Sequence, residues 1–467
     1  MRPQAARGCA YGRWLMAHGH QRRDANTPNF SSRHRYARGL KTTVRILPPL
    51  RGSVMIIVLS VGYASLTHGW GPVAPTGLKS GVLAGRRRYH ANGPPENLIF
   101  HNPSVIIERN ENKPLTSIGH PPTMSNSPFT RIGVINWDCS VPSETTFFGR
   151  YATQSLGPHE FRDRTPYYAI ETGPDTIQYR ERTVADYEIE LRHAIAAGID
   201  YFAYCWYDRK PHTDHVLGGQ AATVDDTVCE LVDARFKHLA SPLRDQIGLC
   251  AILITCHPYR DEELADLAET MKQPYYEKID GRPLVYLFPG PWQPLIERLR
   301  TCCKNAGVAE PYAVMLTDRI SPTDTTKVQA LCAYAGATAQ AKTWNEFFEQ
   351  ELARNDIRAS NGLPVIPHFS MGWNPTPRIK HTVPWVTYPD GIYAQPATVE
   401  ELFTAANRLK SWTEEHRDLC PTGHVLTFAW NEFEEGAWIC PTLGKDAATP
   451  DTHYRDAFAQ IAANWKK

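Results

Sequence analysis

From residue 131 onward, short apolar runs alternate with amphipathic segments, and this alternation is the most constraining feature of the chain. It predicts β/α units and a parallel sheet. Eight apolar runs have the length of strands, and they cover residues 132–137, 201–206, 247–255, 284–288, 312–317, 330–334, 365–370 and 424–430. Six segments have a helical pattern, at residues 183–197, 262–271, 292–305, 344–353, 398–415 and 454–465. Eight strands with intervening helices predict an α/β fold, a (β/α)8 TIM barrel.

A doubly wound open sheet is the alternative arrangement of the same units. Nucleotide-binding members of that fold carry a glycine-rich loop directly after a strand. Neither G-x-G-x-x-G nor G-x-x-x-x-G-K-[ST] follows any of the eight apolar runs. The sequence therefore favours the barrel, and we predict no cofactor.

The amino-terminal segment differs in composition from the rest of the chain. Residues 1–120 contain 17 Lys and Arg against 4 Asp and Glu, whereas the other 347 residues contain 33 against 45. The segment also has little periodicity, which predicts a basic and largely disordered N-terminal extension. We expect this extension to cover residues 1–123 and a catalytic barrel to cover residues 124–467, with Met124 as an alternative start of the protein.

One apolar run of 13 residues, at 54–66, interrupts the extension. Its length is too short to span a bilayer, and a signal segment normally lies closer to the amino terminus. The eleven cysteines lack the spacing of a disulfide framework, which favours a reduced, cytoplasmic compartment. Secretion or an envelope location is expected only if residues 54–66 are a signal segment. No C-x-x-C or H-x-x-x-H pair occurs, so we predict no metal site.

Aromatic and polar side chains are frequent directly after the apolar runs, where a barrel of this kind places its catalytic groups. Aromatic rings stack on the C–H faces of sugars, and polar side chains bind sugar hydroxyls. The candidate substrate-binding residues are Trp206, Tyr207, His257, Trp373, Arg378, Asn431 and Trp438. We predict a carbohydrate substrate, and the acidic charge of the barrel argues against nucleic acid. The alternative for each tryptophan is that it caps the barrel core.

Two glutamates, Glu432 and Glu435, follow the last apolar run. Cleavage of a glycosidic bond needs one protonated carboxyl and one carboxylate. A spacing of three residues puts both side chains on one face of a helical turn, with Glu434 pointing elsewhere, and mutual repulsion with burial raises one pKa. We predict that Glu432 and Glu435 are the catalytic pair. The alternative is that one of them pairs with an arginine such as Arg378, or that the turn is solvated.

At these positions the chain resembles the glycoside hydrolase family 99-like group, which includes the WbsX-type polysaccharide biosynthesis proteins. The resemblance rests on residues 198–203 with Trp206 and Tyr207, on residues 372–378, and on residues 430–432 followed by 435–436 and 441–442. It implies that the barrel is the catalytic domain of a retaining, endo-acting enzyme that cleaves α-mannosides.

The same resemblance implies a role for each glutamate. Glu432 would deprotonate the 2-hydroxyl of the sugar so that this oxygen attacks the anomeric carbon, and Glu435 would be the general acid/base. Two positions depart from the family pattern: Asn374 replaces an aspartate, and Glu434 replaces a histidine that commonly precedes the second glutamate.

Three functions stay open at this point. The first is a glycoside hydrolase, which the paired glutamates among aromatic strand ends favour. The second is a WbsX-like glycosyltransferase or transglycosylase in cell-surface polysaccharide biosynthesis, which the resemblance permits. The third is a non-catalytic carbohydrate-binding barrel, which the two departures permit. We favour them in that order.

Overall fold

The computed structural model describes residues 57–60, 63–66, 127–209, 231–255, 257–338, 340, 342–445 and 449–467. Within the predicted extension, two short strands, β1 (Ile57–Ser60) and β2 (Tyr63–Leu66), pair in antiparallel fashion. The remainder of the extension and the predicted boundary at residue 124 lie outside the described residues. None of the helices in the described ranges is long and apolar enough to cross a membrane.

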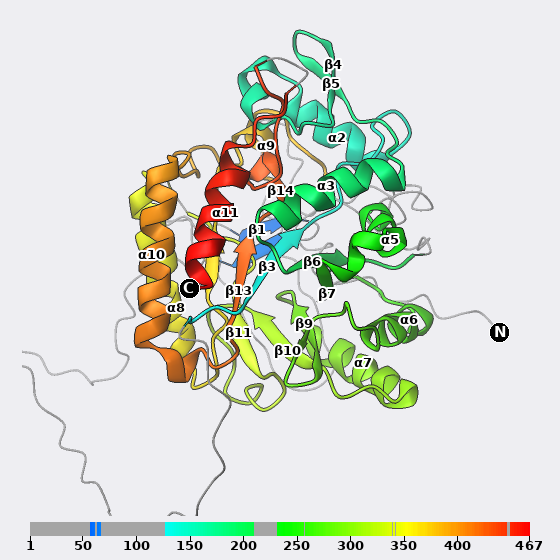
Figure 1. Cartoon of the computed structure of the whole chain (residues 1–467), viewed down its shortest axis with the longest axis vertical. Helices are drawn as coiled ribbons and strands as arrows, with labels where there is room; N and C mark the ends of the chain where they lie inside the picture. Colours follow the sequence, from blue (N-terminus) through cyan, green and yellow to red (C-terminus); the bar gives the residue numbers. More distant parts are fainter. Residues whose placement is uncertain are drawn as a thin grey trace, which may run out of the picture. The chain divides into compact units, whose positions relative to one another are not determined.

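Eight parallel strands form a nearly closed barrel, which confirms the predicted TIM-barrel fold (Figure 1). In spatial order they are β11 (Ala330–Cys332), β10 (Tyr312–Leu316), β9 (Arg282–Leu287), β7 (Gly248–Leu253), β6 (Tyr201–Trp206), β3 (Arg131–Asn136), β13 (His424–Phe428) and β12 (His368–Ser370). A short strand, β8 (Lys278–Ile279), pairs antiparallel with β9. Two backbone hydrogen bonds of 2.9 Å join Leu331 in β11 to Pro364 and Ile366, just ahead of β12, and so bridge the seam.

Helices follow the strands and cover the outside of the barrel (Figure 1). The α-helices around the barrel are α3 (Val184–Ala196), α5 (Asp233–Ala240), α6 (Asp261–Met271), α7 (Trp292–Ala306), α8 (Trp344–Ala359), α10 (Val399–Glu415) and α11 (His453–Trp465). A short helix, α9 (Thr376–Lys380), lies after β12 at the carboxyl end of the barrel. Short 3-10 helices are η2 (Pro242–Asp245), η3 (Arg417–Leu419) and η4 (Phe433–Glu435). α3, α8 and α10 begin with a capping box, in which a threonine and an acidic residue three positions later satisfy each other's backbone N–H groups. These caps fix the helix starts close to where the sequence predicts them.

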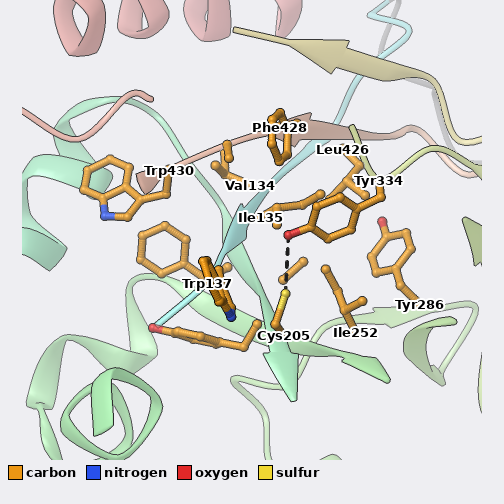
Figure 2. Packing of buried hydrophobic residues seen from close by; sticks show 14 of the residues in the cluster. Val134, Ile135, Trp137, Cys205, Ile252, Tyr286, Tyr334, Leu426, Phe428 and Trp430 are labelled. Atoms are coloured by element: carbon orange, nitrogen blue, oxygen red, sulfur yellow. Dashed lines mark hydrogen bonds between the residues drawn. The ribbon is translucent and has the colours of Figure 1, made fainter. Parts of the chain in front are cut away.

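The barrel core consists of strand side chains that are buried on both faces, as expected for parallel strands enclosed by helices. All six residues of β6 are buried. Figure 2 shows part of the packing, with Val134 and Ile135 of β3 beside Phe428 of β13. In the same cluster the hydroxyl of Tyr334 lies 3.4 Å from the sulfur of Cys205. The strands thus provide a rigid frame for the residues that follow their carboxyl ends.

The structure contains an insertion between β3 and α3 that the sequence pattern does not predict. It comprises α2 (Phe147–Leu156), the 3-10 helix η1 (His159–Arg164) and a hairpin of β4 (Ile170–Gly173) and β5 (Thr176–Gln178). A glycine inside α2, Gly149, weakens the helical signal in the sequence. Packing requires it, because a Cβ atom at Gly149 would lie 2.2 Å from the carbonyl oxygen of Val141. The helices α5 and α9 are likewise absent from the prediction.

Candidate active site

The chain makes a tight reversal directly after β13. β14 (Asn431–Glu432) and β15 (Ala437–Trp438) pair antiparallel around the 3-10 helix η4. Gly436 ends η4 with a φ of 75°, in the left-handed region that favours glycine. A Cβ atom at Gly436 would also lie 2.8 Å from the backbone nitrogen of Asn374, so no larger residue fits. The reversal holds the three glutamates of residues 432–435 at the carboxyl end of the barrel.

Glu432 and Glu435 converge on Arg378 from α9. Glu432 directly precedes the 3-10 turn and Glu435 ends it, and in such a turn side chains three residues apart eclipse each other. The guanidinium of Arg378 forms an ion pair with Oε1 of Glu435, and its Nη2 lies 3.6 Å from Oε2 of Glu432. The hydroxyl of Tyr388 donates a hydrogen bond to the same oxygen of Glu435. All four side chains are buried.

Glu434 also faces Arg378, so the expectation that it points elsewhere is wrong. Nε of Arg378 lies 3.4 Å from Oε1 of Glu434, and Nη2 lies 3.2 Å from Oε2. The hydroxyl of Ser155 in α2 donates to Oε1 of Glu434 at 2.6 Å. The physical reason is that a guanidinium has donors on two edges, so one arginine beside the turn binds Glu434 by one edge and Glu435 by the other.

The surroundings of the two predicted catalytic carboxyls differ. Burial raises the pKa of Glu432 well above its ordinary value, and the charge of Glu435 raises it further. Neither oxygen of Glu432 has a hydrogen-bond partner among the described residues. The pKa of Glu435 is also raised, because burial outweighs the opposing effects of Arg378 and of the Tyr388 hydroxyl and the charge of Glu434 adds to burial. Glu435 has donors that stabilise its charged form and Glu432 has none, so Glu432 is the better candidate for the protonated member of the pair.

Trp373 and Asn431 lie next to this cluster. The ring of Trp373 packs edge-on against Tyr388 at a centroid distance of 5.8 Å, and its Nε1 has no partner in the described structure. Asn431 bridges the ends of β13 and β3, because its Nδ2 donates to the carbonyl of Trp137 at 2.7 Å and its Oδ1 accepts from the N–H of Trp137 at 3.1 Å. The described contacts of Asn431 are those of a residue that holds the barrel mouth together.

The other predicted sugar-binding residues contact different parts of the protein. The guanidinium of Arg235 stacks 3.7 Å above the ring of Trp206, whose Nε1 donates to Glu263. Nε2 of His257 accepts from the backbone of Asp208 at 3.2 Å, and its ring packs edge-on against Tyr207. The ring of Trp438 packs against Tyr454. The structure thus brings Glu432, Glu435, Arg378, Trp373 and Asn431 together and places Trp206, Tyr207, His257 and Trp438 in other contacts.

Two residues that donate hydrogen bonds to Glu434 or Glu435 are missing from the sequence prediction. Ser155 belongs to α2, a helix that the pattern does not reveal. Tyr388 lies between α9 and α10, outside any helix or strand. The signal that points to it is the concentration of Trp385, Tyr388 and Tyr393 in one loop, since aromatic residues in a barrel loop often serve a site.

Two cavities lie away from the glutamates. One, of about 160 Å³, is lined by Asp208, Arg209, Arg260, Glu262 and Glu263, after β6 and at the start of α6. The other, of about 270 Å³, is lined by residues that include Lys272, Lys278 and Gly307, near the amino-terminal end of β9. The side chains of Arg378, Glu432, Glu434 and Glu435 themselves are buried.

Comparison with known proteins gives matches in structure alone. No family model and no curated protein sequence matches the chain. A family GH99 endo-α-mannosidase from Bacteroides thetaiotaomicron has a similar structure, with 12% identity and a TM-score of 0.40 over 72% of this chain and 97% of that chain. An exo-β-1,4-mannosidase from an Opitutaceae bacterium follows with 9% identity and a TM-score of 0.37, over 73% of this chain and 62% of that one. An α-L-fucosidase variant has 9% identity and a TM-score of 0.30, over 72% and 95%. At these values the similarity carries no argument about activity.

Proposed function

We propose that the chain is a glycoside hydrolase that cleaves an oligo- or polysaccharide with Glu432 and Glu435 as its two carboxyl groups. One observation carries this proposal: two buried carboxyls meet at the carboxyl end of β13, and only one of them is hydrogen-bonded by Arg378 and Tyr388. Glu432 has a raised pKa and no described hydrogen bond, whereas Glu435 binds Arg378 and Tyr388. Glycosidic cleavage requires such a pair, with one carboxyl that donates a proton and one that stays charged.

The ionisation suggests how the step proceeds. The proton of Glu432 passes to the glycosidic oxygen as the bond to the anomeric carbon breaks, and the carboxylate of Glu435 stabilises the oxocarbenium-like transition state and takes the proton of the attacking hydroxyl or water. The family 99-like resemblance implies the opposite distribution, with Glu435 as general acid/base. The resemblance also supports a retaining, endo-acting cleavage of α-mannosides, and this form of the proposal goes with that opposite distribution of roles.

Two further proposals concern the whole chain. We propose that residues 124–467 form the catalytic domain, since the basic segment before it differs so sharply in charge. We propose a cytoplasmic location, because the cysteines follow no disulfide pattern and eight in the described ranges are free.

A non-catalytic carbohydrate-binding barrel is the second candidate. One observation favours it: Glu432 and Glu435 are fully buried, and both contact Arg378, as a purely structural ion cluster would. A substrate reaches these carboxyls only if the residues packed over them move. This candidate predicts sugar binding without turnover.

The test is incubation of the full chain with a panel of α-mannosides and other oligosaccharides, with chromatographic detection of new reducing ends. We expect cleavage of at least one member. Calorimetric titration with the same panel runs in parallel. Heat of binding without any product across a broad pH range would contradict the hydrolase and support the carbohydrate-binding barrel.

A further inference from the structure

We propose that Glu434 is a positioning residue, which orients Arg378 and thereby determines that Glu432 rather than Glu435 holds the proton. The inference rests on the proposed function, because the proton matters only if the two carboxyls act on a substrate. It assigns a purpose to a position where this chain departs from the family 99-like pattern.

The first support is the geometry of Arg378. Glu434 binds the edge of the guanidinium formed by Nε and Nη2, at 3.4 and 3.2 Å. A guanidinium is planar with donors in fixed directions, so holding this edge aims Nη1 at Glu435. The rings of Trp137 and Trp385 lie 5.2 and 5.9 Å from the guanidinium carbon and confine it further.

The second support is the anchoring of Glu434 itself. Ser155, near the end of α2, donates to its Oε1 at 2.6 Å. Ser155 is fully buried, and the insertion after β3 carries it into the cluster. The insertion therefore reaches the two predicted catalytic carboxyls through Glu434 and Arg378.

The groups around Glu434 explain the direction of its effect. Charged and titratable side chains face it from five parts of the chain: Arg378 in α9, Glu432 in β14, Glu435 in η4, Cys139 after β3 and Tyr179 after β5. Burial raises the pKa of Cys139 and of Tyr179 well above their ordinary values, so both are neutral. Within this set, three carboxyls share the charge of Arg378.

Glu434 has two effects on Glu432. Burial is the largest cause of the raised pKa of Glu432, the charge of Glu435 comes next, and the charge of Glu434 adds to both. The charge of Glu434 raises the pKa of Glu435 as well, so the choice between the two carboxyls rests on the donors of Arg378. Glu434 also occupies Nη2 of Arg378, the atom that lies 3.6 Å from Glu432 and would otherwise be its donor. Removal of the negative charge at residue 434 should therefore lower the pH at which Glu432 loses its proton.

The experiment follows the carboxyl C=O stretch by infrared difference spectroscopy during a pH titration of the full chain. It needs no substrate, so it gives an answer even if the protein hydrolyses nothing. In the parent protein we expect a protonated carboxyl band at neutral pH that Glu432→Gln removes. In Glu434→Gln the midpoint of this band should fall by about one pH unit, the usual effect of losing one nearby like charge.

The matched control is Glu160→Gln. Glu160 is exposed and pairs with Lys380 on the same helix as Arg378, so this variant loosens α9 without changing the cluster. Its titration should match the parent protein. If Glu434→Gln fails to fold, Ser155→Ala serves, with a smaller fall in the same direction because Glu434 loses the hydroxyl that holds it beside Arg378, and Nη2 of Arg378 becomes freer to bind Glu432. An unchanged or higher midpoint in the folded variant, or no band that depends on Glu432, would overturn the proposal.

Discussion

The two ends of β13 carry opposite charge arrangements. At its amino-terminal end, one carboxylate meets two basic side chains, since Glu277 forms hydrogen bonds with Nε of Arg131 at 2.9 Å and with Nε2 of His424 at 3.0 Å. At its carboxyl end, the single guanidinium of Arg378 contacts three carboxyls. We call the first group the lower cluster (Arg131, Glu277, His424) and the second the upper cluster (Arg378, Glu432, Glu434, Glu435).

The difference shows in the pKa values of the glutamates. Burial alone would raise the pKa of Glu277, but its hydrogen bonds with His424 and Arg131 outweigh burial and lower it. Burial raises the pKa of Glu432 well above the ordinary value, and its neighbouring carboxyls add to the effect. At the amino-terminal end of the barrel the carboxylate is therefore paired with basic groups, which stabilises the fold. At the carboxyl end there are more carboxyls than basic groups, which suits proton transfer. This is the usual division between the two ends of this fold.

The largest stability difference should come from replacing one glutamate at each end by glutamine. Glu277→Gln should lower the free energy of unfolding by about 2 to 3 kcal/mol, because two hydrogen bonds to a charged group are weakened. Glu432→Gln should change it by about 1 kcal/mol or less, since the raised pKa of Glu432 favours its neutral form and neither of its oxygens has a described hydrogen bond. Urea unfolding followed by circular dichroism measures both, and equal losses would break the comparison.

The pH dependence of stability should differ in sign between the clusters. Glu277 has a lowered pKa in the folded state, so its contribution is full above its unfolded pKa and is lost as the pH falls through the folded one. Glu432 has a raised pKa, so it costs stability as the pH rises above its unfolded value. Urea unfolding measures the free energy of unfolding of each protein across pH. The difference between the parent protein and Glu277→Gln should become smaller in acid. The free energy of unfolding of Glu432→Gln should rise relative to that of the parent protein as the pH rises. Parallel profiles for the two variants would contradict the assignment.

The barrel is predictable from the sequence because eight buried strands leave eight apolar runs, and capping residues mark the starts of α3, α8 and α10. The proximity of Glu432 to Glu435 is also predictable from local sequence, because the two residues lie three positions apart in one turn. The orientation of Glu434 is not, because it depends on Arg378, which lies 56 residues earlier and comes close only in the folded barrel.

The aromatic residues show a second limit. A tryptophan at a strand end looks the same in a sequence whether its ring faces a sugar or a neighbouring side chain. The ring of Trp206 has the guanidinium of Arg235 over its face, and this partner follows a segment outside the described residues. The role of Trp206 in sugar binding stays a prediction, as do the roles of Tyr207, His257 and Trp438.

The most direct measurement of the central claim is the hydrolysis rate of Glu432→Gln and Glu435→Gln on a substrate that the parent protein cleaves, compared with an aryl glycoside of the same sugar. We predict that both variants lose about 10²- to 10⁴-fold on the oligosaccharide. Glu432→Gln should recover on the aryl glycoside, whose acidic leaving group needs no proton, while Glu435→Gln should not. Recovery of Glu435→Gln alone would reverse the two roles, and full rates in both variants would contradict the claim that these glutamates are catalytic.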